Sequence, residues 1–180
     1  NVATITMTGN IISNSTGTGV DIRGGTALTF TGNIIGAAGT GTTAASNGSR
    51  GLYLDSSTLA SVVIGGATAA LGNIFAGNVR DGIRIVNLAA DNTSVAIKGN
   101  YIGVCANLST GSISTTNLSQ CKNGEFGIKA ARGNLTIGGN NSLGSAGTGT
   151  IAEANVIAGN ASGAIAISNN AVSTAGVRVA

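Results

Sequence analysis

Hydrophobic and polar residues alternate in short stretches along this chain. In Thr4-Ile5-Thr6-Met7-Thr8 every second residue is apolar, and the same alternation returns at residues 27–31 and 95–98. A second set of stretches opens with glycine and alternates in the same way, as in Gly19-Val20-Asp21-Ile22 and Gly82-Ile83-Arg84-Ile85. A period of two with many β-branched residues predicts β-strands with one buried face. Since no stretch of comparable length has the 3.6-residue period of a helix, we expect an all-β fold.

The alternation also predicts which side chains face inward. We expect two sets of inward-facing residues, one for each kind of strand. The first set is Ile5, Met7, Leu28, Phe30, Val95, Ile97, Val177 and Val179, and the second is Val20, Ile22, Leu52, Leu54, Ile83, Ile85, Ile165 and Ile167.

A glycine–asparagine pair recurs between the two kinds of strand. Glycine and asparagine tolerate positive φ better than other residues, so the pair predicts a corner between two sheets. Asparagine amides stacked at the corners of successive coils can hydrogen-bond to one another and to the next backbone. We expect a structural corner ladder made of Asn10, Asn33, Asn73, Asn100 and Asn155, the last of which lacks its glycine.

The repeats combine into a longer period, which is the pattern of a solenoid. Residues 63–78 match residues 136–160, and residues 32–36 match residues 99–103, which gives a super-repeat of 73 or 67 residues. We expect one domain over residues 1–180, with about six or seven coils and super-repeats near 1–62, 63–135 and an incomplete 136–180.

Insertions rich in glycine, serine, threonine and alanine interrupt the coils. The two long ones, residues 37–50 and 104–125, occupy the same place in the super-repeat, and a shorter one covers residues 140–153. We expect the two long insertions to project side by side from one edge.

Three stretches, residues 73–78, 81–85 and 98–103, resemble the Asn/Gly-rich repeats of right-handed parallel β-helix proteins. This is the pectin-lyase-like superfamily, and within it the large secreted and surface-attached bacterial proteins. The resemblance covers nearly the whole chain. It implies a right-handed parallel β-helix, a solenoid with loop insertions. It implies no particular activity, because this architecture hosts lyases, hydrolases, epimerases, adhesins and phage spikes.

The amino-acid composition excludes several classes of function. The chain is 42% hydrophobic but only 3% aromatic and 8% charged, and its net charge of +3 comes from scattered residues. Nucleic-acid binding needs a basic stripe with interleaved aromatic residues, so we expect no nucleic-acid partner. No apolar run approaches the 18–20 residues of a membrane span. The chain begins at Asn1 without a signal-peptide pattern, and we expect a processed or excised segment.

The two cysteines, Cys105 and Cys121, bracket a polar insertion. Zinc usually takes four cysteine or histidine ligands, and the chain has no histidine, so we expect no metal and no other cofactor. A disulfide at the base of a loop is the better interpretation than two free thiols. It favours an oxidising, extracellular or cell-surface location.

Polysaccharide chemistry is the main alternative to a structural role. The resemblance implies that lyases and hydrolases would cluster acidic residues on one outer face, whereas this chain has six carboxylates in all. Glycoside hydrolysis needs two of them about 5–10 Å apart. The outward positions of the glycine-led strands are Asp21, Tyr53, Arg84 and Lys129, a possible glycan-facing ladder without an acid pair. Asp21 could pair with Arg84 across coils. We expect no enzyme activity, and the absence of histidine removes every His-dependent triad.

Ice binding is a second alternative, because flat arrays of threonine on solenoids can bind ice. Thr4, Thr6 and Thr8 fit this pattern together with Thr29 and Thr31. Ala96, Lys98 and Arg178 then interrupt the face.

The function that we expect is mechanical. Solenoids usually need capped ends, and both ends of this chain are strand-like without a capping helix or a run of charge. An end-to-end contact that does not close builds a fibre. We therefore expect a structural β-solenoid, either a filament subunit whose partner is itself or a stalk within a larger surface protein.

Overall fold

Three parallel β-sheets make up this all-β protein, as a computed structural model of residues 3–88, 93–114, 118–139, 153–168 and 178–179 shows. The first sheet contains β1 (Thr4–Thr8), β4 (Ala27–Thr31), β9 (Ser61–Gly65), β12 (Ser94–Lys98), β17 (Asn134–Ile137) and β20 (Arg178–Val179). The second contains β2 (Ile11–Ile12), β5 (Ile34–Ile35), β10 (Ile74–Phe75), β13 (Tyr101–Ile102) and β18 (Val156–Ile157). The third contains β3 (Val20–Ile22), β8 (Leu52–Ser56), β11 (Ile83–Leu88), β16 (Phe126–Ala130) and β19 (Gly163–Ile167).

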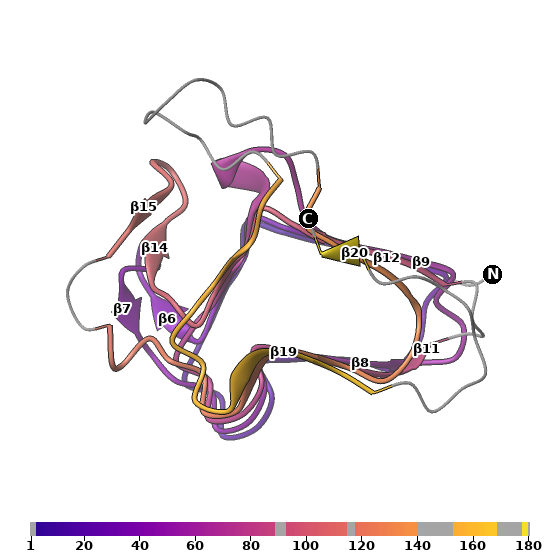
Figure 1. The fold of residues 1–180 in the computed structure, drawn as a ribbon, viewed down its shortest axis with the longest axis horizontal. Coiled ribbons are helices and arrows are strands. Elements are labelled where there is room, and N and C mark those ends of the chain that lie inside the picture. The colour runs from indigo at the N-terminus through magenta and orange to yellow at the C-terminus, as the bar shows by residue number, and fades with distance from the viewer. Residues whose placement is uncertain (1–2, 89–92, 115–117, 140–152, 169–177, 180) are drawn as a thin grey trace.

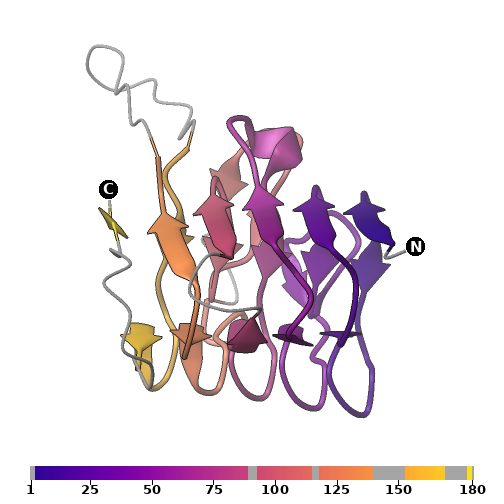
Figure 2. The same ribbon diagram turned by 90° about the vertical axis from the view of Figure 1, so that its right-hand side faces the viewer.

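The chain visits the three sheets in turn, and each visit to all three makes one rung. Every strand pairs in parallel with the corresponding strand of the next rung. The rungs follow one another from the N-terminal to the C-terminal end of the stack (Figure 2). The described residues form five complete rungs and the first strand of a sixth, below the six or seven expected. This arrangement is compatible with a parallel β-helix.

The main hydrophobic core fills the space between the three sheets. Leu28, Phe30, Leu52, Leu54, Ile83, Ile85, Val95 and Ile97 are fully or almost fully buried there, as expected. Val62, Ile64, Leu135, Ile137 and Ile128 join them and were not among the expected inward residues. The rings of Phe30 and Phe75 stack with centroids 5.9 Å apart. The core thins at the last rung, where Ile167 is 41% exposed, and the side chains of Val177 and Val179 lie outside the described residues.

The two long insertions lie side by side, as expected. Each forms an antiparallel hairpin after a strand of the second sheet: β6 (Ala37–Ala38) with β7 (Thr43–Ala44), and β14 (Ala106–Asn107) with β15 (Ser112–Ile113). The backbone N–H of Ala106 donates to the carbonyl of Gly41 at 3.1 Å, so the hairpins are in contact. Both lie on the same side of the stack (Figure 1). Most of the third insertion, residues 140–152, lies outside the described residues.

A second hydrophobic core lies between the second sheet and these insertions. It contains Ile34, Ala37, Ile74, Ala76, Tyr101, Val104, Cys105, Ala106 and Cys121. The outer face of the second sheet is therefore covered by the protein itself, unlike the outer faces of the other two sheets.

The helical content of the described residues is the single turn η1 (Ala69–Leu71), between β9 and β10. No helix in this part of the chain has the length and hydropathy that a membrane span requires.

Candidate functional site

A column of asparagines runs along the corner between the first and second sheets. Each side-chain Oδ1 accepts the backbone N–H and the Nδ2–H of the asparagine on the preceding rung, with distances of 2.8–3.1 Å. Each Nδ2 beyond the first rung also donates to a main-chain carbonyl of the first sheet, as Asn73 does to Phe30 at 2.8 Å. The column, called here the first ladder, consists of Asn10, Asn33, Asn73, Asn100 and Asn155. Asn33, Asn73 and Asn100 are completely buried.

The backbone at this corner corrects one part of the expectation. Gly9, Gly32 and Gly99 have φ between +64° and +69°, whereas Gly72 has φ −64°. Asn14 is the one non-glycine residue of the described chain with a positive φ, and it is not in the ladder. The ladder asparagines therefore serve as hydrogen-bonding groups, and the positive φ at this corner belongs to the glycine before the asparagine on three of the five rungs.

A second ladder, absent from the sequence-based expectations, runs along the corner between the second and third sheets. Its Nδ2 groups donate to the Oδ1 of the next rung at 2.9–3.0 Å, and to carbonyls of the second sheet such as Phe75 O. The second ladder consists of Asn47, Asn78, Asn123 and Asn160. On the first rung Ser15 takes this position and donates its backbone N–H to Asn47 Oδ1 at 3.1 Å.

The glycines that open the third-sheet strands make room for this second ladder. A Cβ added at Gly19, Gly51, Gly82 or Gly127 would lie 2.8–2.9 Å from the Nδ2 of a ladder asparagine and 2.6–2.9 Å from a carbonyl of the next rung. These positions do not have positive φ. Glycine is needed here for close packing, which is the sequence signal that could have revealed the second ladder.

The Cys105–Cys121 disulfide is confirmed. Its sulfur atoms are 2.09 Å apart and both cysteines are fully buried in the second core. The carbonyl of Cys121 accepts the N–H of Gly77 at 2.9 Å, next to Asn78 of the second ladder. The disulfide thus fastens the second insertion to the stack beside the second ladder.

The third sheet presents the charged outer face of the molecule. Asp21, Tyr53, Arg84 and Lys129 lie opposite one another on successive rungs, followed by Ala166. The structure therefore places the four expected residues in one column.

The acidic end of this column is occupied by internal ion pairs. Arg23 donates two hydrogen bonds to Asp21 at 3.0 Å and a third at 3.2 Å, and it lies 3.9 Å from Asp55. The expected pairing of Asp21 with Arg84 is wrong, because Tyr53 occupies the rung between them and Arg23 lies two residues from Asp21 on the same face of its strand. The Arg23 partnership raises the pKa of that guanidinium.

Two arginine side chains lie close to the aromatic ring of Tyr53. The guanidinium carbons of Arg23 and Arg50 lie 5.6 Å and 5.0 Å from the centre of its ring, within the range of cation–π attraction. Its hydroxyl donates to Asp55 at 3.2 Å, and Asn87 donates to the other oxygen of Asp55 at 2.9 Å. The ring and the hydroxyl of Tyr53 thus both have partners within the protein.

Asp81 is the most deeply buried of the described carboxylates, with 1% of its side chain exposed. Its Oδ1 accepts the N–H of Phe126 at 3.2 Å, and Arg50 Nε lies 3.6 Å from its Oδ2. Burial raises the pKa of Asp81 above its usual value of 3.8, and the Phe126 N–H opposes the shift. Asp81 is thus buried between rungs, in contact with Arg50 and with the backbone of Phe126.

The basic end of the column is different. Arg84 is half-buried, and its Nε and Nη1 are covered by protein but have no hydrogen-bond partner among the described residues. Lys129, opposite Arg84 on the next rung, has no carboxylate within 4.0 Å in the described part of the chain, and its ammonium lies 5.2 Å from the Phe126 ring centre. Within the described part of the chain, these two neighbouring cations form no ion pair with a carboxylate, although the positive charges of both act on the buried Asp81 and oppose the rise in its pKa that burial causes.

The outer face of the first sheet is built from small residues. The register aligns Thr6 with Thr29, and then with Val63 and Ala96 on the following rungs. Lys98 reaches Glu153 at 3.0 Å. Threonine pairs occur on the first two rungs, Val63 and Ala96 interrupt the column on the third and fourth, and Thr136 returns in it on the fifth.

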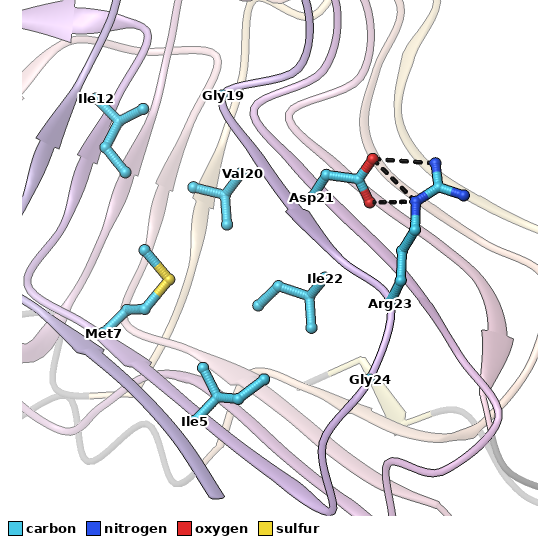
Figure 3. A pocket seen from close by; sticks show the side chains of 9 residues that line it. All are labelled: Ile5, Met7, Ile12, Gly19, Val20, Asp21, Ile22, Arg23 and Gly24. Carbon is cyan, nitrogen blue, oxygen red and sulfur yellow. Dashed lines mark hydrogen bonds and ion pairs between the residues drawn. The ribbon is translucent and has the colours of Figure 1, made fainter. Parts of the chain in front are cut away.

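Among the described residues, nothing stacks on the outer side of the first rung. A pocket of about 510 Å³ there is lined by residues that include Ile5, Met7, Ile12, Val20 and Ile22, whose side chains point into the lumen, while Asp21 and Arg23 lie outside it (Figure 3). Strands β1, β2 and β3 each pair on one side within the described chain, with the second rung. Ile11 is 55% exposed at the same end.

No protein-family model, curated protein or solved structure matches this chain. The proposals below therefore depend on its own geometry.

Proposed function

We propose that this chain is a mechanical element, a right-handed parallel β-helix of the pectin-lyase-like type that functions outside the cell as a filament subunit or surface stalk. In the filament role another solenoid rung, supplied by a second copy of this chain, covers the first rung; in the stalk role the rung belongs to the larger surface protein. Right-handedness is supported by the near-universal hand of parallel crossover connections. The extracellular location is supported by the buried disulfide, since such bonds persist in oxidising compartments.

The observation that carries the proposal is the chemistry of the first rung. It offers an apolar lumen lined by Ile5, Met7 and Ile12, surrounded by three strand edges that pair with no other strand in the described part of the chain. The first ladder is directional as well, because each asparagine donates toward the next rung. A neighbouring rung would bury the apolar residues, pair the edges and extend the ladder in one direction, which is a head-to-tail contact.

The test is negative-stain electron microscopy of the purified chain, with light scattering over a concentration series. We expect filaments that lengthen with protein concentration. Met7→Lys places a charge in the open lumen and is expected to abolish them. Thr6→Lys is the matched control, since Thr6 is exposed on the same strand and points outward, and it is expected to leave assembly unchanged.

A clean monomer at high concentration would overturn the filament role. Equal loss of assembly in both variants would overturn the first-rung contact, because a general effect of charge would then explain the result. Circular dichroism of each variant separates failure to assemble from failure to fold.

Carbohydrate binding on the third sheet is the second candidate. It is favoured by the alignment of Tyr53, Arg84 and Lys129 in one column. Catalysis there has less support, because the outward carboxylates Asp21 and Asp55 both contact Arg23. Ice binding has less support again, since Val63, Ala96 and Lys98 replace the threonines of the first two rungs.

A further inference from the structure

We propose that Arg84 and Lys129 form a binding site for an oxyanion, namely a sulfate, phosphate or carboxylate group. This site is independent of end-to-end assembly, because it lies on the outer face of the third and fourth rungs rather than at the end of the stack.

The unsatisfied guanidinium of Arg84 is the central observation. Burying polar atoms without partners is unfavourable, and the loss is greater for a charged group. The Nε and Nη1 of Arg84 are covered and have no acceptor among the described residues. An oxyanion placed against this edge of the guanidinium would supply the missing acceptors in the paired geometry that arginine favours.

Arg50 Nε is likewise buried without a hydrogen bond among the described residues, but Arg50 and the other neighbouring arginines differ from Arg84 in having a carboxylate within 4.0 Å. Arg23 contacts Asp21 and Asp55, Arg50 lies 3.6 Å from Asp81, and Arg80 lies 3.8 Å from Glu125. Arg84 and Lys129 are adjacent in register without such a carboxylate. The proposed site therefore consists of Arg84 and Lys129 alone, and the rest of the charged face of the third sheet is not part of it.

The spacing of the two residues suits one small anion. Neighbouring strands are about 4.8 Å apart, so a single group can accept hydrogen bonds from a guanidinium and an ammonium on adjacent rungs. Access requires the side chains that cover Nε and Nη1 to part. The neighbours of Arg84 in register, Tyr53 and Lys129, are half-buried rather than fixed in the core.

The experiment uses sodium sulfate, sodium phosphate and sodium acetate in separate titrations, each compared with sodium chloride at equal ionic strength. We expect the arginine Nε–H resonance of Arg84 to shift with saturation in ¹⁵N-edited NMR. For a dissociation constant of about 10 mM, 50 mM of the preferred anion would raise the folded-to-unfolded ratio about sixfold. The ranking of the three salts identifies which oxyanion fits.

Arg84→Gln is expected to lose this specific stabilisation. Arg84→Lys is expected to keep only part of it, because an ammonium group cannot donate two parallel hydrogen bonds as a guanidinium does. Arg132→Gln is the charge-matched control, since Arg132 is exposed and lies two residues after the end of β16. Sulfate stabilises most proteins by exclusion from their surfaces, and this effect is common to all variants. Equal responses of Arg84→Gln and Arg132→Gln, or an Arg84 resonance that does not respond, would overturn the site.

Discussion

The two asparagine ladders are built from the same hydrogen bonds but from different sequence contexts. In the first ladder Asn73 donates to Asn100 Oδ1 and to Phe30 O, and accepts from Asn33. In the second ladder Asn123 has the same set of contacts with Asn160, Phe75 O and Asn78. A corner ladder is therefore a consequence of stacking equivalent rungs, and it does not depend on the glycine–asparagine phrase that marks the first ladder.

The difference between the ladders lies in what precedes them. The asparagines of the first ladder stand directly before the short strands of the second sheet, so each is followed by an apolar pair. The asparagines at positions 47 and 123 of the second ladder lie near the ends of the two long insertions, which differ in length. The second ladder is held in place by packing against the glycines of the third sheet and by the neighbouring disulfide.

The largest expected effect tests whether the two ladders are equally strong. Asn73→Ala and Asn123→Ala each remove four hydrogen bonds of a completely buried side chain. With about 1 kcal/mol for each bond, we expect each substitution to lower the free energy of unfolding by about 4 kcal/mol. Chemical denaturation measures both values.

Asn134→Ala is the control for this pair, because Asn134 is exposed on β17. It is expected to change the free energy of unfolding by less than about 0.5 kcal/mol. If Asn123→Ala costs less than half as much as Asn73→Ala, the equivalence of the ladders is wrong, and the first corner holds the stack alone.

The disulfide gives the next largest effect and acts on one ladder. Replacing both Cys105 and Cys121 by alanine opens a loop with a sequence separation of 16. We expect a loss of about 3 kcal/mol. Because Cys121 bonds Gly77 beside Asn78, the side-chain amides of Asn78 and Asn123 are expected to exchange with solvent faster, while those of Asn73 and Asn100 keep their protection.

Hydrogen-exchange NMR on the double alanine variant measures this contrast. Equal loosening of both ladders would mean that the disulfide stabilises the rungs as a whole rather than the second corner. A variant that unfolds completely can be compared instead with the reduced wild-type protein under milder conditions.

The comparison of the ladders also explains how far the sequence could predict this molecule. Period-two alternation over five residues identifies inward side chains such as Leu28 and Phe30, because one face of each long strand is apolar. The cysteine pair could be predicted because two cysteines flank one insertion. The strands of the second sheet have only two residues, and both Ile34 and Ile35 are buried, in different cores. Alternation over two residues cannot show that both faces are covered.

Other features depended on contacts that are distant in the chain. Gly77-Asn78 and Gly159-Asn160 repeat one another and could have marked part of the second ladder. Asn47 and Asn123 precede glycine instead, so the glycine–asparagine pair does not mark all members of the ladder. The Arg23–Asp21 pair could have been found locally, since residues two apart share a face of a strand. The lack of an ion pair at Arg84 could not have been predicted locally. It depends on which carboxylates form ion pairs with the other arginines, and some of these pairs join distant parts of the chain.

The smallest effect concerns the first rung, where the two ladders differ. Asn10 begins the first ladder with an amide donating to Asn33 Oδ1 at 2.9 Å, whereas Ser15 begins the second with only its backbone N–H bonded to Asn47. Ser15→Asn would add an amide donor to Asn47 Oδ1 and raise the free energy of unfolding by about 0.5–1 kcal/mol. Asn10→Ser removes the corresponding bond and is expected to lower it by a similar amount. Thermal and chemical denaturation of both variants measure these opposite shifts. If Ser15→Asn destabilises the protein, the first rung departs from the geometry of the other rungs at its second corner, and Ser15 is there because an amide does not fit.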